Sequence, residues 1–388
     1  MSNRRLVVTA PRGSGGSYTH LSEVLPRLMT LRPDWNIELH ASPEVLRASF
    51  GTLGEPWMRP LSGSTYLHRA RWEFGRLPQM LRSDPSLLVW APFGPPANLA
   101  LAPRTVWMSR NIIPLLPMRM WEVSRADMMR VLALRGNLML WARTARKTIA
   151  VSKDAQMRLA RLARVAPDSI PVIPHGVGPA PTSTPVGERR HESVRRQPYL
   201  LHVGQPTAYR RTRELFQAYA RLADERPDLP PLLAAGTARR VDASYERTCT
   251  DLLESAVLRG QAHLLGQISH SEVMDLMAEA HAFLYPSVHE NCPNVVLEAL
   301  GAGRVGVYSD IPTIRELAGG AGIFVPTPSA ENLAPAIVRA SFDLQLRADV
   351  SREARLRAAL FSWERTANLT AAALDAAFAV NPGDGRTP

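Results

Sequence analysis

The stretch HENCPNVVLEALGAG, residues 289–303, places two glutamates, Glu290 and Glu298, eight positions apart among small and apolar residues. Directly before it, residues 282–285 form a short apolar run that Pro286 interrupts, a pattern typical of a buried strand in a parallel sheet. In such sheets ligands bind beyond the carboxyl ends of the strands. The sequence therefore predicts that both carboxylates face one crevice at the ligand-binding edge of a sheet.

The residues between the two glutamates predict the start of a helix. Asn294 is a residue type that caps helices, so we expect a helix from Val295, with Glu298 about one turn inside it. First-turn amides near Asn294 and Val295 could hold a diphosphate, and a carboxylate could accept hydrogen bonds from sugar or ribose hydroxyls. Alternatively, Glu298 caps its own helix and Glu290 is a solvated loop residue.

The length of 388 residues predicts two domains, because one hydrophobic core stops growing at roughly 250–300 residues. Alternating apolar runs and helical segments form two series, at 1–178 and 198–362, and each predicts a doubly wound α/β domain. Residues 179–197 are rich in Pro, Ser, Thr and charge and predict a linker. An amphipathic helix at about 363–380 and a disordered tail at 381–388 are expected to end the chain.

Charge is unevenly distributed along the chain. Residues 1–180 contain 24 lysines and arginines against 11 acidic residues, a balance of +13, whereas the remainder contains 22 against 24. The basic half therefore predicts an anionic partner for the first domain. Cys249 and Cys292 are too few for a disulfide framework or a zinc cluster, and no apolar stretch reaches about 18 residues. A cytoplasmic protein is the expectation.

The motif at 286–299 resembles that of the retaining GT-B glycosyltransferases of family 4, the glycosyl transferases group 1. It has the form PS…E-x-C-P-N-x-x-x-E-A of the family's E-x7-E element, and HVGQPTAYRRTRELFQAYARL and IPTIREL flank it in the familiar order. In the first half, GSGG, AVSKDA and VIPHGV match more loosely. The resemblance implies a GT-B fold with two Rossmann-like domains facing a central cleft, the first for the acceptor and the second for a nucleotide sugar. It also implies that the last helix packs back onto the first domain.

The resemblance also implies roles for individual residues. Glu298 would accept hydrogen bonds from the ribose hydroxyls of a nucleotide sugar, and Glu290 would hold hydroxyls of the transferred sugar near the anomeric carbon. Arg210 stands at the family's usual lysine and would meet the diphosphate with a bidentate fork. Glu290 and Arg210 are thus the predicted catalytic residues.

Further donor contacts are predicted around these residues. Gln205 stands where many family members have an arginine, and Arg211 or Arg213 could compensate for that lost charge; alternatively, both arginines begin a solvated helix. The remaining predicted substrate-binding residues are Gly204, Asn294, Val295 and Ile268 in the second half, and Gly15, Gly16 and Asn111 in the first.

Two histidines of the first half are candidate functional groups. His20 could act as a base in an inverting enzyme, but a place on the surface of its helix is the favoured interpretation. His175, in IPHGV, is interpreted as a turn residue rather than a ligand.

The chemistry implied by the family needs stabilisation of a leaving diphosphate. No two aspartates stand two positions apart, so the Asp-x-Asp metal motif is absent and we expect metal-independent catalysis without a cofactor. Retention is commonly explained by acceptor attack on the face that the diphosphate leaves, which requires no side-chain nucleophile.

Two other functions remain open from the residues alone. A nucleotide-sugar epimerase shares the two-domain architecture, and a non-catalytic nucleic-acid-binding protein could use the basic half. Nucleic-acid grooves usually interleave aromatics with the positive charge, so no nucleic-acid partner is expected. The segments 67–82 and 119–147 combine arginine with apolar residues, as helices lying on an anionic bilayer do. A lipid-linked saccharide phosphate at the inner membrane face and a soluble acidic glycan are the acceptors considered; an arginine-rich surface around an ordinary core is the alternative.

Overall fold

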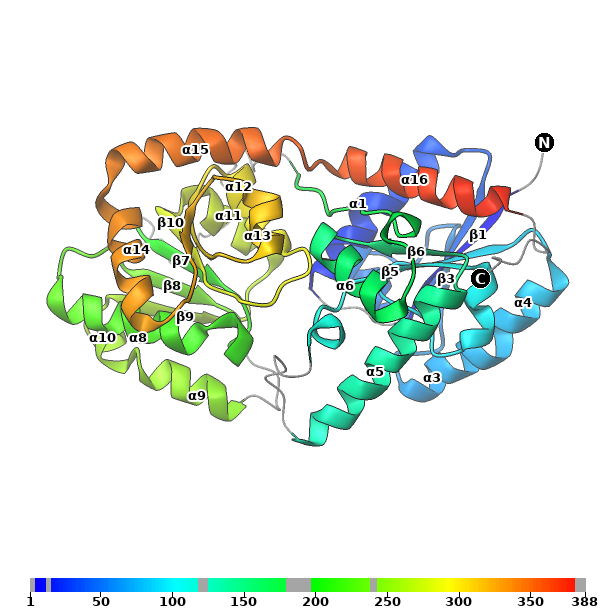
Figure 1. The fold of residues 1–388 in the computed structure, drawn as a ribbon, viewed down its shortest axis with the longest axis horizontal. Helices are drawn as coiled ribbons and strands as arrows, with labels where there is room; N and C mark the ends of the chain where they lie inside the picture. Colours follow the sequence, from blue (N-terminus) through cyan, green and yellow to red (C-terminus); the bar gives the residue numbers. More distant parts are fainter. Residues whose placement is uncertain (1–3, 12–14, 118–124, 179–196, 238–242, 381–388) are drawn as a thin grey trace. The chain divides into compact units, whose positions relative to one another are not determined.

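The computed structural model describes residues 4–11, 15–117, 125–178, 197–237 and 243–380 (Figure 1). The chain divides into two compact units. The first unit comprises Met1–Gly176 with Trp363–Pro388, and the second comprises Val177–Ser362. The predicted tail 381–388 and all but the last residue of the predicted linker 179–197 lie outside the described residues.

The first unit contains a six-stranded sheet in which every neighbouring pair is parallel. Its strands are β1 (Arg5–Ala10), β2 (Asn36–Ala41), β3 (Met58–Pro60), β4 (Leu88–Ala91), β5 (Thr105–Ser109) and β6 (Lys147–Ala150), in the order β3-β2-β1-β4-β5-β6. Its helices are α1 (Gly16–Leu31), α2 (Pro43–Phe50), α3 (Tyr66–Ala70), the π-helix η1 (Arg71–Arg76), α4 (Leu77–Ser83), α5 (Arg125–Thr144), α6 (Lys153–Ala163) and α16 (Trp363–Ala379), with the short 3-10 helices η2 (Leu99–Arg104), η3 (Ile113–Leu115) and η5 (Pro167–Ser169).

The second unit repeats this topology. Its strands are β7 (Leu200–Val203), β8 (Leu232–Ala235), β9 (Ala262–Gly266), β10 (Ala282–Tyr285), β11 (Val305–Ser309) and β12 (Ile323–Val325), all parallel, in the order β12-β11-β10-β7-β8-β9. Its helices are the 3-10 helix η6 (Ala208–Arg210), α8 (Thr212–Glu225), α9 (Ala243–Asp251), α10 (Glu254–Leu258), α11 (His270–Glu279), α12 (Asn294–Gly301), α13 (Pro312–Ala318), α14 (Ala330–Phe342) and α15 (Leu344–Ala358). The two doubly wound α/β units predicted from the sequence are confirmed.

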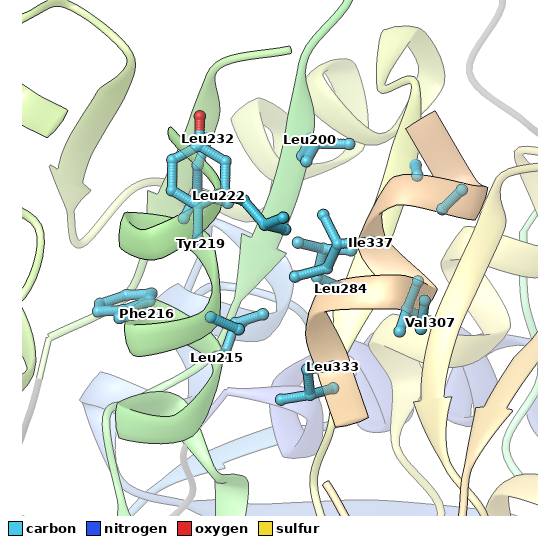
Figure 2. Close-up of a cluster of buried hydrophobic side chains, with 14 of the residues drawn as sticks. Leu200, Leu215, Phe216, Tyr219, Leu222, Leu232, Leu284, Val307, Leu333 and Ile337 are labelled. Carbon is cyan, nitrogen blue, oxygen red and sulfur yellow. The ribbon is translucent and has the colours of Figure 1, made fainter. Parts of the chain in front are cut away.

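The core of the second unit explains why its strands read as continuous apolar runs. Figure 2 shows α8 and α14 packing their apolar side chains over β7 and β10. Tyr219, Leu215 and Ile337 meet Leu200 and Leu284, and all five side chains are fully buried. A strand covered on both faces needs apolar residues at successive positions, and each large side chain removed from water contributes roughly 1.5–3 kcal/mol.

The last helix, α16, lies against the first unit, beside α1 (Figure 1). Asp375 of α16 accepts hydrogen bonds from Arg4 and from Arg32, each at 2.5 Å. Phe378 packs edge-to-face on Trp35, with ring centroids 5.1 Å apart. These half-buried ion pairs and the aromatic contact tie α16 to the residues that precede β1 and follow α1.

Two segments have features that no local pattern in the sequence predicts. Between Tyr245 and Gly260 the chain forms two helices, α9 and α10, because it turns at Leu252 and Leu253 so that Leu253 enters the core. β3 was not predicted: it has three residues, of which only Met58 is buried, so it leaves no apolar run in the sequence.

Candidate active site

The predicted glutamate motif lies at a break in the strand order of the second unit. From β7 the sheet continues to β8 and β9 on one side, and from β10 to β11 and β12 on the other. The loop after β7 contains Gly204 and Gln205, and the loop after β10 contains Glu290. The two loops therefore flank the topological switch point, where doubly wound sheets bind ligands.

Glu290 is held firmly by hydroxyl groups. Tyr285 and Ser287 both donate hydrogen bonds to its Oε1, at 2.5 and 2.8 Å, and Thr313 donates to its backbone carbonyl at 3.1 Å. The side chain remains 13% exposed. Burial and the neighbouring carboxylate raise the pKa of Tyr285 well above its ordinary value, so the phenol stays a donor. The carboxylate is thus fixed in one orientation before any ligand arrives.

Arg210 lies beside this carboxylate. Its Nε is 3.9 Å from Glu290 Oε1, and its Nη1 would lie 3.0 Å from a Cβ placed on Gly204. Burial acts to lower the pKa of Arg210, but Tyr285, Glu290 and Tyr209 outweigh it and raise the pKa. The guanidinium is therefore permanently charged. Its Nε is buried and has no hydrogen-bond partner among the described residues.

Next to Arg210, glycines bring the backbones of neighbouring loops close together. Gly204 donates its N–H to Ala235 at 2.9 Å, and Gly236 donates to Gly266 at 2.7 Å, so the loops after β7, β8 and β9 are joined. Gly236 has a φ of 126°, and a Cβ there would lie 2.2 Å from the Gly204 carbonyl oxygen. Only glycine fits this contact. The arrangement leaves peptide groups that a ligand can approach closely.

Glu298 is a buried carboxyl group with an unsatisfied oxygen. The residue is 8% exposed, and its Oε2 is buried without a hydrogen-bond partner among the described residues. Its Oε1 lies 3.9 Å from His270 Nδ1. Burial raises the pKa of Glu298 to about 7. No side chain caps α12, so the self-capping alternative is wrong. A buried polar atom with no partner requires an explanation, and a ligand hydroxyl would supply one.

The start of α12 is one residue earlier than expected. Pro293 is the N-cap residue and Asn294 is the first helical residue, so the predicted capping role of Asn294 is wrong. The reason is that Pro293, whose φ is fixed near −73°, already has the extended conformation of a cap and its carbonyl accepts from Val296 N at 3.1 Å. Asn294 and Val295 are half-buried in the first turn, where backbone amides lack intrahelical acceptors.

The other predicted donor residues are more peripheral. Arg211 has a left-handed backbone conformation, and its Nη1 lies 3.4 Å from Glu214 Oε1 on the same helix, as in the helix-start alternative. Arg213 and Gln205 are exposed, and Ile268 is half-buried in the loop between β9 and α11. The side chain of Arg210 thus meets Glu290 and Gly204, whereas that of Arg211 turns to Glu214. The roles of Gln205 and Ile268 stay predictions.

In the first unit, the predicted residues lie near the carboxyl ends of β1 and β5. Gly15, with a φ of 45°, precedes α1, and the Gly16 carbonyl accepts a hydrogen bond from Arg110 at 3.1 Å. The Asn111 side-chain oxygen accepts a hydrogen bond from Ile113 N at 3.1 Å, so it is already engaged in the turn that leads into η3. The start of α1 at Gly16 and the segment after β5 are therefore joined through Arg110.

A cavity of about 350 Å³ adjoins Asn111 at the ends of β1, β4 and β5, which is the switch point of this sheet. Glu73 of the π-helix lies in its wall and is 1% exposed. Its Oε1 accepts from Arg69 Nε at 2.7 Å and its Oε2 from Ala97 N at 2.5 Å. Sequence reasoning missed Glu73, because an isolated glutamate among arginines reads as a surface residue.

The interpretation of His20 as a helix-surface residue is wrong. His20 is fully buried, with its ring centroid 5.2 Å from that of His175 and 5.8 Å from that of Trp363. It lies on the same face of α1 as Leu21 and Val24, which pack into the core. Burial lowers the pKa of His20 well below its ordinary value, so the ring is neutral. His175 is also buried and stacks on Trp363.

The described parts of the chain offer neither a metal site nor a membrane span. No three His, Cys, Asp or Glu side chains among the described residues gather closely enough to hold a metal ion. Within the same residues, every helix is too short or too polar to span a bilayer.

Comparison with known proteins gives one family model and several relatives that match part of the chain. Residues 187–357 match the model of the family described as glycosyl transferases group 1. The chain is 27% identical over 174 residues to O-antigen chain mannosyltransferase B of Escherichia coli, covering 45% of each chain. It is 31% identical over 109 residues to the phosphatidyl-myo-inositol mannosyltransferase of Mycolicibacterium smegmatis, covering 27% of this chain and 28% of that one. The matches span less than half the length of these relatives.

Solved structures resemble the chain over nearly its whole length. HepE of Anabaena, solved in complex with UDP and glucose, has a TM-score of 0.72 at 16% identity, covering 96% of this chain and 100% of that one. WaaG, a glycosyltransferase involved in lipopolysaccharide biosynthesis, has a TM-score of 0.67 at 15% identity, with 94% and 98% covered. These similarities confirm the predicted GT-B fold.

Proposed function

We propose that this protein, whose residues 187–357 carry a glycosyl transferases group 1 domain, transfers a hexose from a nucleotide-diphosphate sugar to a hydroxyl of a glycan or glycolipid. The observation that carries the proposal is the arrangement at the switch point of the second unit. There two hydroxyls hold Glu290, 3.9 Å from the Arg210 guanidinium, which itself lies against Gly204. A leaving diphosphate needs a fixed cation, and a sugar needs a fixed acceptor of hydroxyl hydrogen bonds.

The nucleotide end of the donor is assigned to Glu298. Its buried Oε2 lacks a donor, and the two adjacent hydroxyls of a ribose would provide donors to this carboxyl group. Burial makes the unliganded, ionised carboxylate costly, so hydroxyls that stabilise the charge would bind with a corresponding gain. In this proposal Glu298 selects a nucleotide with an intact ribose or a similar diol.

The diphosphate is assigned to Arg210, with the amides of Asn294 and Val295 at the start of α12. The helix start presents N–H groups and a partial positive charge. Arg210 adds a full charge whose guanidinium Nε has no hydrogen-bond partner among the described residues. Glu290 would hold hydroxyls of the sugar and keep the anomeric carbon next to the departing phosphate.

The proposed reaction is a direct displacement. The bond between the anomeric carbon and the phosphate oxygen breaks, and its electron pair leaves with the nucleoside diphosphate. The acceptor oxygen bonds to the same carbon, and its proton passes to the departing phosphate oxygen. Attack therefore comes from the face that the diphosphate leaves and the anomeric configuration is retained. Arg210 stabilises the growing negative charge. Metal-independent catalysis is proposed because the chain has no Asp-x-Asp pair.

The acceptor is assigned to the first unit, at the cavity beside Asn111. The cavity combines the ion pair of buried Glu73 and half-buried Arg69 with aromatic and proline side chains, which suits a saccharide ring with its hydroxyls. The O-antigen mannosyltransferase among the relatives supports a role in cell-surface polysaccharide or glycoconjugate synthesis. Such a role would take place in the cytoplasm or at the inner face of the cell membrane.

A phosphorus NMR experiment tests the proposal. The wild type and Glu290→Ala are incubated at high concentration with a panel of UDP-, GDP- and dTDP-sugars, with water as a slow acceptor. The proposal expects one nucleoside diphosphate to accumulate with the wild type and far more slowly with the variant. A product that keeps its diphosphate bond but carries an isomerised sugar would identify an epimerase instead. Consumption of no donor, together with tight binding of short oligonucleotides, would reject the enzyme.

A further inference from the structure

A second cavity of the first unit lies beyond the ends of β2 and β3. Its volume is about 270 Å³, and its lining includes Arg59, Ser62, His68, Arg71 and Arg76. The lining carries three guanidinium groups and no carboxylate. We refer to it as the cationic cavity.

The π-helix explains why two of these arginines lie together. Arg71 and Arg76 are five residues apart, and they mark the two ends of the π-helical segment. In an α-helix, with 3.6 residues per turn, side chains five apart point in different directions. The i→i+5 hydrogen bonding of a π-turn aligns them instead, and such turns are frequent at functional sites. The segment therefore presents both guanidinium groups to the same cavity.

Neither of these two arginines is neutralised within the protein. Arg71 and Arg76 are exposed and make no hydrogen bond or ion pair with any described residue. Glu73, on the same π-helix, is buried and bound to Arg69 and to the Ala97 amide. It cannot also compensate the two exposed charges.

Glu38, which pairs with residues that line the cavity, is also engaged. It pairs with Arg59 Nη2 at 3.2 Å and His40 Nε2 at 3.3 Å, and Arg5 Nη2 lies 3.9 Å away. Arg59 is therefore neutralised, while Arg71 and Arg76 remain as two unpaired positive charges over one cavity. His68 adds a polar ring held by Thr65 at 2.8 Å.

The inner wall of the cavity is rigid. Trp72 is buried, and its ring stacks on His40 with centroids 4.4 Å apart and an interplanar angle of 18°. Burial lowers the pKa of His40 to about 4, and the positive charges of Arg76 and Arg59 contribute to this shift. The electrostatic effect of both arginines therefore reaches this wall. Trp72 Nε1 also donates to Thr9 Oγ1 at 2.9 Å. Thr9 lines the larger cavity beside Asn111 and Trp72 lines the cationic cavity, so this hydrogen bond joins the walls of the two cavities.

We propose that the cationic cavity binds a phosphate or diphosphate group of the acceptor, while the acceptor's saccharide lies in the neighbouring cavity. This inference rests on the proposed function. Two unpaired guanidinium forks match the oxygens of a doubly charged phosphate in geometry and in charge. The shared Trp72–Thr9 wall places the phosphate next to the ring whose hydroxyl would be glycosylated. The anionic partner predicted for the first domain would thus bind at the cationic cavity.

Calorimetric titration with inorganic pyrophosphate tests this site. Because pyrophosphate could also enter the proposed donor site, all proteins carry Arg210→Ala. The test variant adds Arg71→Gln and Arg76→Gln. The matched control adds Arg47→Gln and Arg82→Gln, which remove the same charge from exposed helix positions of the first unit that line neither cavity. All four residues are exposed, so equal melting temperatures are expected.

The expected result is one saturable pyrophosphate site that weakens at least tenfold in the test variant and less than twofold in the control. Equal weakening in both variants would mean that only the general positive field attracts the anion, and would overturn the proposal. Absence of a saturable site at low salt would also overturn it. Because sugar nucleotides play no part in this titration, failure of the donor assignment would not affect it.

A competition experiment distinguishes the two sources of the phosphate. The protein is mixed with phosphatidylcholine vesicles that contain phosphatidic acid, and saturating pyrophosphate is then added. Release from the vesicles assigns the cavity to a lipid-borne phosphate. Vesicle binding that survives saturating pyrophosphate, or its absence in a protein that binds pyrophosphate, assigns the cavity to a soluble phosphorylated glycan.

Discussion

Replacing Glu298 with glutamine is expected to stabilise the second unit at alkaline pH. Burial raises the pKa of this carboxyl group from 4.5 to about 7. Because the folded pKa is the higher one, the group's stabilising contribution is full below about pH 4.5 and is lost as the pH rises through about 7. A difference of about 2.5 pH units corresponds to about 3 kcal/mol. Glutamine has the shape of the neutral acid and does not ionise.

The gain from Glu298→Gln should therefore depend on pH. The gain in the free energy of unfolding should be about 1 kcal/mol at pH 5.5 and about 3 kcal/mol at pH 8. For a unit of this size, the gain at pH 8 corresponds to a rise of roughly 6–12 °C in melting temperature. Differential scanning calorimetry of both proteins at the two pH values measures it. His270→Gln is the control, since His270 is the titratable neighbour at 3.9 Å and its removal should leave the pH dependence in place. A gain that does not change with pH would refute the reasoning.

The same substitution should weaken donor binding. Ribose hydroxyls bond best to the ionised carboxylate, and a hydrogen bond to a charged group contributes about 1.5–3 kcal/mol. Glu298→Gln should thus cost roughly 10- to 100-fold in donor affinity while it stabilises the unliganded protein. In the wild type, affinity should fall about tenfold per pH unit below pH 7, because the carboxyl group must lose its proton to bind. Isothermal titration across pH 5.5–8 tests this opposite trend.

Three further substitutions probe the rest of the site. Glu290→Ala should lower kcat with little change in donor affinity, because a contact beside the reacting carbon strengthens as charge develops; unchanged turnover would contradict its role. Arg210→Ala should lower kcat/KM by roughly one to two decades, from the loss of about 1.5–3 kcal/mol of charge-assisted bonding, and a normal rate would move that role to another arginine. Gly236→Ala should abolish donor binding, since its Cβ would lie 2.2 Å from the Gly204 oxygen; calorimetry showing native affinity would reject the close-packed loop.

The sequence predicted the elements that are covered on both faces. The apolar run 282–285 coincides with β10, because a strand between two helix layers cannot carry polar residues at alternate positions. The glutamate motif was predicted for a related reason: it stands where such a strand ends and a helix begins. Arg210 beside Glu290 came from the family resemblance, and no local pattern could place the two side chains together.

Other features depend on contacts distant in sequence. Glu73 is buried only because Arg69 and the Ala97 amide meet it, and neither partner is visible as a pattern. The π-helix leaves no periodicity of its own in six residues. His20 is different: its spacing of four from Val24 placed it on the buried face of α1, and that signal was available.

Arg69 also changes the interpretation of the basic segment 67–82. In the sequence it resembles Arg71, Arg76 and Arg82 as a surface charge, yet its Nε is bound to the buried Glu73. A change of Arg69 to glutamate would put a second carboxylate beside the buried Glu73 and disrupt the segment itself, so this arginine is unsuitable for a charge-reversal test of membrane binding. Arg71 and Arg76 are the residues that test anion recognition cleanly.

The most direct test of the central claim is calorimetric binding of a panel of sugar nucleotides to the wild type, Arg210→Ala and Glu298→Gln. At least one UDP- or GDP-sugar, whose ribose carries both hydroxyls, is expected to bind the wild type and, at 100 times its Kd, to add about 2.7 kcal/mol to stability. Both variants should bind that ligand at least tenfold more weakly. If no sugar nucleotide binds the wild type, or if both variants bind as tightly as the wild type does, the switch point of the second unit is not a donor site.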